Sequence, residues 1–215
     1  MTGFLEPKIS YSSDGLDFMI PYYQVISDKS DITIAVRNIS DRGAGLEGNV
    51  RNLHGESNNL RNIDLFYFNN DKEHRSNYPA EPKSRWAFGI RDTFGKKENI
   101  WMTIDWAKTS DSLVLRDIPG DITSIGNQRK QNLKQNIAIN GVFRNIKIKI
   151  SQEGYQTLNP LLTNGYKKAP SIDIEYFNMF KKISIREHLN ITEFRAENLH
   201  GFFGNQLNNN KFQSY

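Results

Sequence analysis

Residues 142–150 read Val-Phe-Arg-Asn-Ile-Lys-Ile-Lys-Ile, and this stretch decides the fold class. Ile146, Ile148 and Ile150 alternate with two lysines. A period of two places neighbouring side chains on opposite faces of a β-strand. The pattern is typical of a half-buried strand with one apolar face and one face in water. We therefore predict a strand here, and the same period recurs along much of the chain.

Further alternating runs predict a chain built mainly from strands. Asp14-Gly15, between the alternating runs of residues 8–24, predicts a hairpin because a type I′ turn favours positive φ at both central residues. The other predicted strands cover residues 31–39, 63–68, 86–90, 100–104, 113–118, 137–139, 172–177 and 183–185. Short strands at this spacing predict a mainly β fold, an antiparallel sandwich or jelly roll with one or two short helices.

Four segments interrupt the alternation. Residues 121–136 and 186–199 are predicted helices, the first of them capped by Asp121. Residues 40–62 are rich in glycine and residues 69–84 contain two prolines, so both are predicted to be long loops. Irregular segments of this length in a compact domain are usually functional or mobile.

The domain organisation is predicted to be simple. We expect a single β-rich domain over residues 1–215, with a weak candidate boundary near residues 119–121 and a candidate C-terminal arm at residues 201–215. The arm contains aromatic residues among glycines and asparagines, which have little local structure to bury them. Its predicted interface residues are Phe202, Phe203, Phe212 and Tyr215. They are expected to dock on a neighbouring copy or, equally, on the chain's own core.

Composition excludes several function classes. The chain has 215 residues and no cysteine, which excludes a disulfide framework, a thiolate nucleophile and zinc-finger chemistry. Its 28 Lys and Arg against 24 Asp and Glu indicate a mixed surface with weak attraction to nucleic acid. No run approaches the roughly 20 apolar residues of a bilayer-spanning helix, and residues 1–18 lack a signal-peptide pattern. We therefore expect no membrane insertion, and a location in the cytoplasm of the producing cell or within a virion or other assembly.

No motif predicts a catalytic, cofactor or metal site. His188 and His200 are a candidate metal pair only if one helix carries both, and two separate surface histidines are the simpler interpretation. Asp117 and Asp121 flank a Pro-Gly turn where they could converge as acid and base, although Asp121 also suits a helix cap. The chain lacks a nucleophile elbow and a phosphate-binding glycine loop. We predict no cofactor and no enzymatic activity.

Two features suit a binding module. Lys147 and Lys149 line one strand face near Arg144, a pattern that could follow phosphates or could be the solvated side of a sheet. Trp86 and Trp101 could stack on sugar rings, although aromatic residues more often fill a β core. The leading prediction is a non-enzymatic structural protein, such as a viral or phage virion or occlusion component. It would associate with further copies or other subunits through its loops and arm. A carbohydrate- or nucleic-acid-binding module and a hydrolase with a His/carboxylate site are the alternatives.

Overall fold

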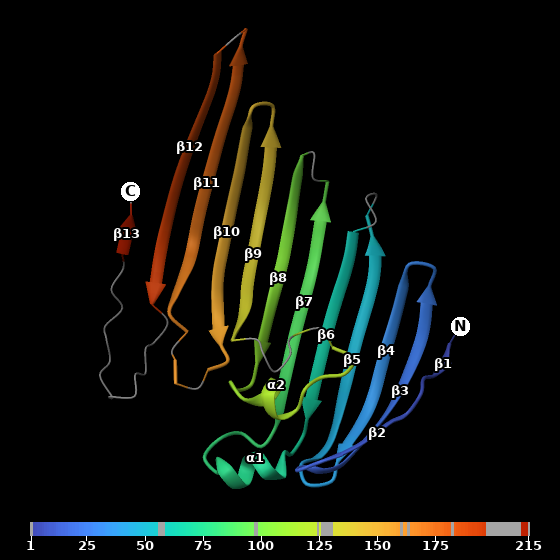
Figure 1. The fold of residues 1–215 in the computed structure, drawn as a ribbon. Coiled ribbons are helices and arrows are strands. Elements are labelled where there is room, and N and C mark those ends of the chain that lie inside the picture. Colours follow the sequence, from blue (N-terminus) through green and yellow to red (C-terminus); the bar gives the residue numbers. More distant parts are fainter. Residues whose placement is uncertain are drawn as a thin grey trace. The chain divides into compact units, whose positions relative to one another are not determined.

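The protein is mainly antiparallel β-sheet with two short helices (Figure 1), which confirms the predicted fold class. We describe it from a computed structural model. The residues described are 2–55, 59–96, 99–123, 125, 131–159, 161–162, 164–181, 183–196 and 212–214. Neither helix of this described part has the length and apolar character of a membrane-crossing helix.

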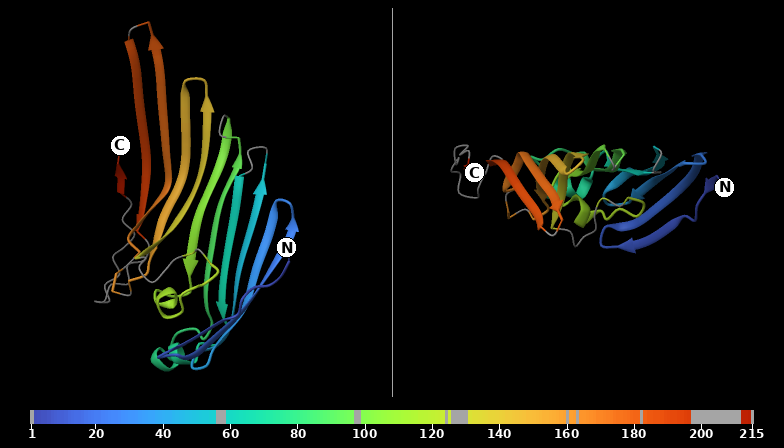
Figure 2. Two further views of the ribbon diagram at one scale, coloured as in Figure 1. Left: turned by 45° about the vertical axis from the view of Figure 1, so that its right-hand side comes forward. Right: turned by 90° about the horizontal axis from the view of Figure 1, so that it is seen from above.

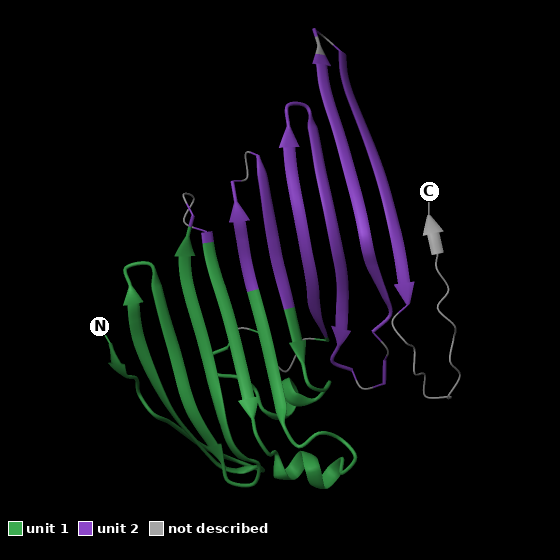
Figure 3. Ribbon diagram, turned by 180° about the vertical axis from the view of Figure 1, so that it is seen from behind, with its two compact units in different colours: residues 1–54, 60–90, 107–131 green, residues 55–59, 91–106, 132–215 purple. Residues whose placement is uncertain are grey.

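The chain divides into two compact units, and each is described by itself (Figure 3). Unit 1 comprises residues 1–54, 60–90 and 107–131; unit 2 comprises residues 55–59, 91–106 and 132–215. Within each unit the strands form one open sheet in which sequence neighbours pair, rather than the two stacked sheets of a sandwich or jelly roll. The candidate boundary at residues 119–121 lies inside unit 1.

Unit 1 holds the first strands and both helices. Its strands are β1 (Gly3–Phe4), β2 (Lys8–Ser12), β3 (Gly15–Ser27), β4 (Ser30–Ile39), β5 (Gly43–His54), nearly all of β6 (Asn59–Phe68) and parts of β7 (Arg85–Gly95) and β8 (Ile100–Thr109). Helix α1 is Lys72–Asn77 and helix α2 is Val114–Asp117. The predicted hairpin is present, but Ser12 pairs with Gly15, so its turn is Ser13-Asp14 and not Asp14-Gly15.

The predicted glycine-rich loop at residues 40–62 is wrong, because most of it forms β5 and the start of β6. Glycine normally weakens a strand, so its presence here needs a packing reason. A Cβ atom on Gly45 would overlap ring carbons of Phe68, which is fully buried. Gly45 is therefore a glycine because the Phe68 ring packs directly on the β5 backbone.

Gly45→Ala is expected to lower the free energy of unfolding by about 1–3 kcal/mol, because the added methyl group overpacks the Phe68 contact. Gly48→Ala is the matched control on the same strand, since the nearest atom to its added Cβ is the Thr33 carbonyl oxygen at 4.0 Å. Urea denaturation of both variants measures the difference. Equal stability of the two variants would contradict this packing role.

Other predicted elements are also misplaced. The predicted strand at residues 113–118 contains α2 instead. The predicted helix at residues 186–199 lies largely in strand β12. Of the predicted helix at residues 121–136, residues 121–123 and 125 are irregular, residues 132–136 open strand β9, and the rest includes residues outside the described part. The predicted loop at residues 69–84 contains α1.

Unit 2 contains the remaining strands. These are the other parts of β7 and β8, followed by β9 (Asn132–Phe143), β10 (Ile146–Thr157), β11 (Tyr166–Phe180), β12 (Ile183–Ala196) and β13 (Phe212–Ser214). Strands β9 to β12 form a meander in which each strand pairs antiparallel with the next (Figure 1). Among the described residues of unit 2, only Leu133 and Ala138 are buried apolar residues.

The apolar core lies in unit 1. Its buried side chains come from strands β3, β4, β6 and β7 and from residues 110–125, which carry α2. The core residues of this unit are Met19, Ala35, Ile39, Phe66, Phe68, Ala87, Leu113, Val114, Leu115, Ile118 and Ile125. The α2 segment lies on one face of the unit 1 strands, as the view along the strands shows (Figure 2). One face of this sheet is therefore covered, while no other described segment of unit 1 forms such a layer on the opposite face.

Candidate functional site

A row of apolar side chains crosses five strands of unit 2. The strand register places Met102 beside Ile139, Ile139 beside Ile150, Ile150 beside Ile172, and Ile172 beside Ile191. Residues directly opposite one another in antiparallel strands point to the same face. Ile139, Ile150 and Ile191 are 50%, 46% and 52% exposed. Unit 2 therefore presents an apolar face, and these side chains are not the filling of a core.

The opposite face of unit 2 is polar along the same strands. One position along β10, Ser151 lies beside Ser171, which lies beside Thr192. The hydroxyl groups of Ser171 and Thr192 are 2.8 Å apart and form a buried hydrogen bond. On the next row of this face, the Asn190 side-chain amide donates to Asp173 at 2.5 Å. The two faces thus differ in polarity although a single residue step separates them.

Unit 1 has an apolar exposed face as well. Ile20 lies beside Val36, and Val36 lies beside Leu46. All three side chains are exposed. On β4, the two neighbours of Val36 along the chain, Ala35 and Arg37, point to the covered face and are buried. Ile32 and Ile34 of β4 point to the same exposed face as Val36, because alternate residues of a strand share a face.

The covered face of unit 1 is closed by a strap, which we define as residues 110–123. Arg85 of β7, which is 0% exposed, holds the start of the strap. Its Nε and Nη2 atoms donate to the two carboxylate oxygens of Asp111 at 3.0 and 2.7 Å, and Nη1 donates to Asp117 at 3.1 Å. Nη1 also donates to Asp71, the N-cap of α1, at 2.9 Å. Arg85 therefore links both helical segments to the sheet.

The end of the strap is held by a second buried pair. Arg37 donates to Glu47 at 2.7 Å and to the Pro119 carbonyl oxygen at 2.7 Å. Glu47 in turn accepts from the backbone N–H groups of Asp121 and Ile122 at 2.9 and 3.1 Å. The predicted convergence of Asp117 and Asp121 as acid and base does not occur. Asp117 accepts from Arg85 at the start of the strap, whereas the backbone N–H of Asp121 donates to Glu47 at its end.

The strap carboxylates are held in the ionised form. Burial opposes ionisation of Asp111, but hydrogen bonds and charge from Arg85 outweigh it and lower the pKa of this carboxyl below its ordinary 3.8. Burial likewise opposes ionisation of Asp71, while the His74 N–H, Arg85 and Arg42 together lower its pKa. A carboxyl whose folded pKa is depressed stabilises the fold above its unfolded pKa and loses this contribution as pH falls.

We therefore expect the free energy of unfolding to fall as pH decreases below about 4, where these carboxyls begin to bind protons in the unfolded chain. Asp111→Asn is expected to be less stable at pH 7 and to lose less stability on acidification, because one of the titrating groups is gone. Denaturation midpoints between pH 7 and pH 2 measure both effects. A variant with the unmodified chain's acid slope would show that Asp111 does not contribute to it.

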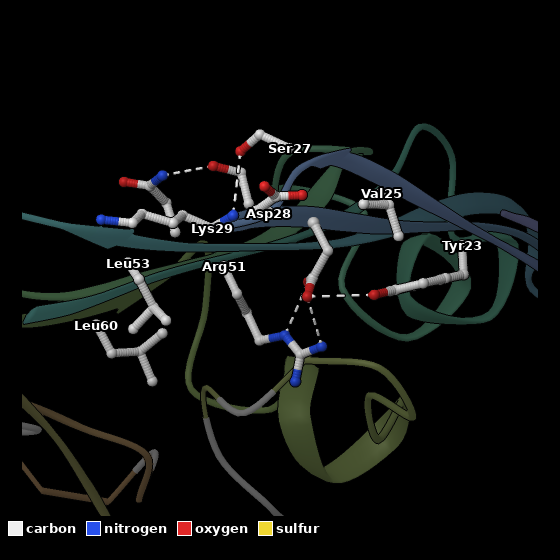
Figure 4. Close-up of a pocket in the computed structure, with 11 residues that line it drawn as sticks. Tyr23, Val25, Ser27, Asp28, Lys29, Arg51, Leu53 and Leu60 are labelled. Carbon is white, nitrogen blue, oxygen red and sulfur yellow. Dashed lines mark hydrogen bonds and ion pairs between the residues drawn. The ribbon is translucent and has the colours of Figure 1, made fainter. Parts of the chain in front are cut away.

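A pocket of about 440 Å³ lies near the β3–β4 turn of unit 1 (Figure 4). Its charged centre is already satisfied, since Arg51 donates from Nε and Nη2 to Asp31, both at 2.8 Å, and the Tyr23 hydroxyl also donates to Asp31. Leu53 and Leu60 line another part of the pocket. The two cations of the lining, Lys29 and Arg51, face two carboxylates, Asp28 and Asp31, so this hollow offers little attraction for an anionic ligand.

A smaller hollow of about 210 Å³ lies at the β9–β10 turn of unit 2. Arg144, Lys147 and Arg186 line it, together with Glu175 and Phe177. Within the described part of the chain, none of these three cations has an ion-pair partner. This hollow is therefore the more electropositive of the two.

The predicted metal pair does not form a described site. His188 is exposed, with Nε2 at 3.6 Å from Asp173, while His200 lies outside the described residues. His74 is buried and its Nε2 lies 3.0 Å from Glu81. The described residues contain no group of three or more His, Asp or Glu side chains placed to hold a metal ion.

The predicted C-terminal interface is only partly described. Phe202, Phe203 and Tyr215 lie outside the described residues, as does most of the arm at residues 201–215. Phe212 belongs to β13, whose backbone pairs with β12 so that Phe212 lies opposite Phe194 of the same chain. Docking of the arm on a second copy stays a prediction.

These faces define the class of protein: it is an antiparallel-sheet protein whose long strands carry apolar side chains on one exposed face and polar side chains on the other. No family model matches the chain. It is similar to LPS-assembly protein LptD of Pseudomonas aeruginosa, with 28% identity over 178 residues that are 82% of this chain and 18% of the relative. The LPS-assembly protein LptD of Neisseria meningitidis is 30% identical over 173 residues, 79% of this chain and 20% of the relative. The chain thus spans about a fifth of the length of these relatives.

These similarities correct the predicted function. The relatives are bacterial and are named for LPS assembly, so the prediction of a viral or phage virion or occlusion component is wrong, as is the hydrolase alternative. The predicted location in the cytoplasm or a virion is wrong for the same reason, because LPS belongs to the bacterial envelope. The reasoning failed because a β pattern without catalytic motifs is shared by many unrelated non-catalytic proteins.

Sequence reasoning also missed the buried contacts of Arg85, Arg37 and Glu47 that hold the strap, and it missed the exposure of the apolar faces. The alternation of Ile146, Ile148 and Ile150 was visible, but alternation cannot tell a core from another apolar environment. The length of the alternating runs was a usable signal for these faces, since the alternation continues well beyond a usual strand of about 5–6 residues. No local sequence pattern predicts the contacts that hold the strap, because Glu47 accepts from backbone N–H groups 74 and 75 positions away.

Proposed function

We propose that this chain is a membrane-embedded section of a bacterial LPS-assembly protein. The apolar faces contact the hydrocarbon of the outer membrane, and the polar faces lie on the side along which LPS head groups pass. The observation that carries the proposal is the exposed row from Met102 to Ile191, which crosses five strands and is not covered by any other described segment of unit 2. The relatives' name supplies the substrate class.

Strand length supports the same proposal. Each strand from β3 to β12 has 10 to 15 residues. At roughly 3.3 Å per residue, 10 residues extend about 33 Å, which matches a hydrocarbon core of about 30 Å. Antiparallel pairing satisfies the backbone polar groups between neighbouring strands, as a lipid environment requires.

Alternating polarity supports the proposal on energetic grounds. Roughly 1.5–3 kcal/mol of favourable transfer is available for each large apolar side chain removed from water. Unit 2 leaves Ile139, Ile150 and Ile191 about half exposed, so its own fold gains only part of this free energy. Lipid chains would supply it along a whole face. Strands that alternate apolar and polar residues are typical of sheets that separate lipid from an aqueous interior.

The proposal adds partners and revises one expectation. Assembly with other subunits of an LPS-assembly apparatus fits the relatives' name, while homo-oligomer formation stays a prediction. The expectation of no membrane insertion considered only apolar helices, and we replace it with insertion through strands. The prediction that the chain is not an enzyme is kept.

Adjacent cysteine variants test the proposal, because the chain has no cysteine of its own. Ile150→Cys lies on the apolar face and Lys149→Cys on the polar face of the same strand. After reconstitution into phospholipid vesicles, a water-soluble maleimide is expected to label Lys149→Cys and to leave Ile150→Cys largely unmodified. In the chain unfolded by urea without lipid, both should react. Equal labelling in vesicles would contradict lipid contact at the apolar face.

A further inference from the structure

Three cations converge on the hollow at the β9–β10 turn. Lys147 lies on the polar face of β10, opposite Glu175 of β11, and Arg186 lies opposite Phe177 on the same face. Arg144 lies in the turn itself and lines the hollow with them. Glu175 is one carboxylate against three cations, so the lining carries an excess of positive charge. Such a concave lining concentrates anions.

The arginines are arranged for a ligand more than for the fold. The guanidinium carbon of Arg186 lies 5.8 Å from the centre of the Phe177 ring, which holds it beside the hollow. Arg144 has a φ of 52°, a conformation in which glycine or asparagine would be less strained. Neither arginine forms an ion pair among the described residues. A cation kept in an unfavourable backbone conformation without an internal partner indicates a role outside the fold.

We propose that this hollow binds a phosphate group carried by LPS, with Arg144, Lys147 and Arg186 as its ligands. The inference rests on the proposed function, since it assigns the polar face to the head-group side. Arginine suits this role because its planar N–H groups donate two parallel hydrogen bonds to phosphate oxygens. The Phe177 ring offers an apolar wall beside the bound group.

The hollow is placed suitably for a lipid-borne ligand. Strands β11 and β12 extend past the β9–β10 turn (Figure 1), so the hollow lies where the shorter hairpin ends against a longer one. In the proposed membrane orientation, the end of a hairpin approaches the layer of charged head groups. The same chemistry could bind free phosphate, so a test must separate the two sources.

The test compares ligands on the full chain in detergent micelles. Three probes are titrated: a phosphorylated lipid A, the same lipid with its phosphates removed, and inorganic phosphate. We expect the phosphorylated lipid to bind more tightly than both others, which assigns the source to the lipid. Tighter binding of inorganic phosphate would assign the hollow to free phosphate and overturn the lipid source. Equal binding of the two lipids would overturn the phosphate site.

Variants locate the binding. Arg144→Asn removes a cation while keeping a residue that tolerates positive φ, and Arg186→Gln removes the second. Each is expected to weaken binding of the phosphorylated lipid about tenfold, the loss typical of a charge-assisted hydrogen bond. Lys149→Gln is the control on the same face, because Lys149 lies opposite Asp173 and does not line the hollow. Equal weakening by the control would overturn the assignment.

The inference and the proposed function can fail separately. If Ile150→Cys is protected in vesicles but lipid binding is independent of phosphate, the inference alone is wrong. If Ile150→Cys stays reactive, the membrane proposal is wrong, whatever the phosphate titrations show.

Discussion

Arg85→Met is expected to lower the free energy of unfolding by about 3–5 kcal/mol, the loss typical when one partner of a buried ion pair is removed. The methionine fills a similar volume, so the loss measures charge rather than packing. Asp111 would remain largely buried without its cation, and Asp71 would keep Arg42 alone. The strap would lose the Arg85 side-chain bonds and would be held to β7 at its start by the Ser110–Trp86 hydrogen bonds.

Arg116→Met is the matched control for Arg85→Met. Arg116 lies 3.4 Å from the same residue, Asp117, but its side chain is exposed. Exposed pairs contribute about 0–1 kcal/mol, so this variant should unfold almost as the unmodified chain does. Urea denaturation in one detergent, followed by tryptophan fluorescence, compares them. If the two variants were equally stable, the buried cluster would not be what holds the strap.

Leu189→Arg is expected to oppose membrane insertion by about 2–4 kcal/mol if residue 189 lies near the bilayer midplane, with a smaller effect closer to the interface. Leu189 lies beside Ile174 on the apolar face of unit 2 and is exposed there. The physical reason is that a guanidinium must leave water to enter hydrocarbon. The fraction of chain recovered with vesicles, measured over a range of lipid concentrations, reports the change.

His188→Arg is the control one residue away. His188 lies beside Glu175 on the polar face, and its side chain is exposed. The added charge stays in water in the proposed arrangement, so vesicle binding should change little. If vesicle binding of both arginine variants were impaired equally, the loss would come from an added charge on either face of β12, and the assignment of faces would be wrong.

The β class could be predicted from sequence because alternation is a local property. The isoleucines of β10 gave a correct strand since strand period acts within a few residues. Asp14-Gly15 located a hairpin, but the turn itself is formed by Ser13 and Asp14, and Gly15 is the first residue of β3. Strand β5 was missed because Gly45 is explained only by Phe68, which is 23 positions away in sequence. The α2 segment was missed because it is only four residues long, too short to show a helical period.

The candidate site was less predictable than the fold. Lys147 and Arg144 were noted as part of a basic face, yet their hollow depends on Arg186 from another hairpin. The apolar faces were visible as sets of residues, but the sequence does not say which medium they contact. The predicted arm at Phe202 and Phe203 drew attention to residues outside the described part of the chain.

A spin-label scan of β10 tests the central claim most directly. Single cysteines at positions 146 to 152, each labelled with a nitroxide and reconstituted in bilayers, report collisions with oxygen and with a water-soluble nickel complex. We predict that oxygen collisions peak at Ile146, Ile148 and Ile150 and that nickel collisions peak at Lys147 and Lys149. The two profiles should alternate with a period of two residues and opposite phase. Oxygen and nickel profiles that rise and fall together, or that show no alternation, would contradict lipid contact along the apolar face.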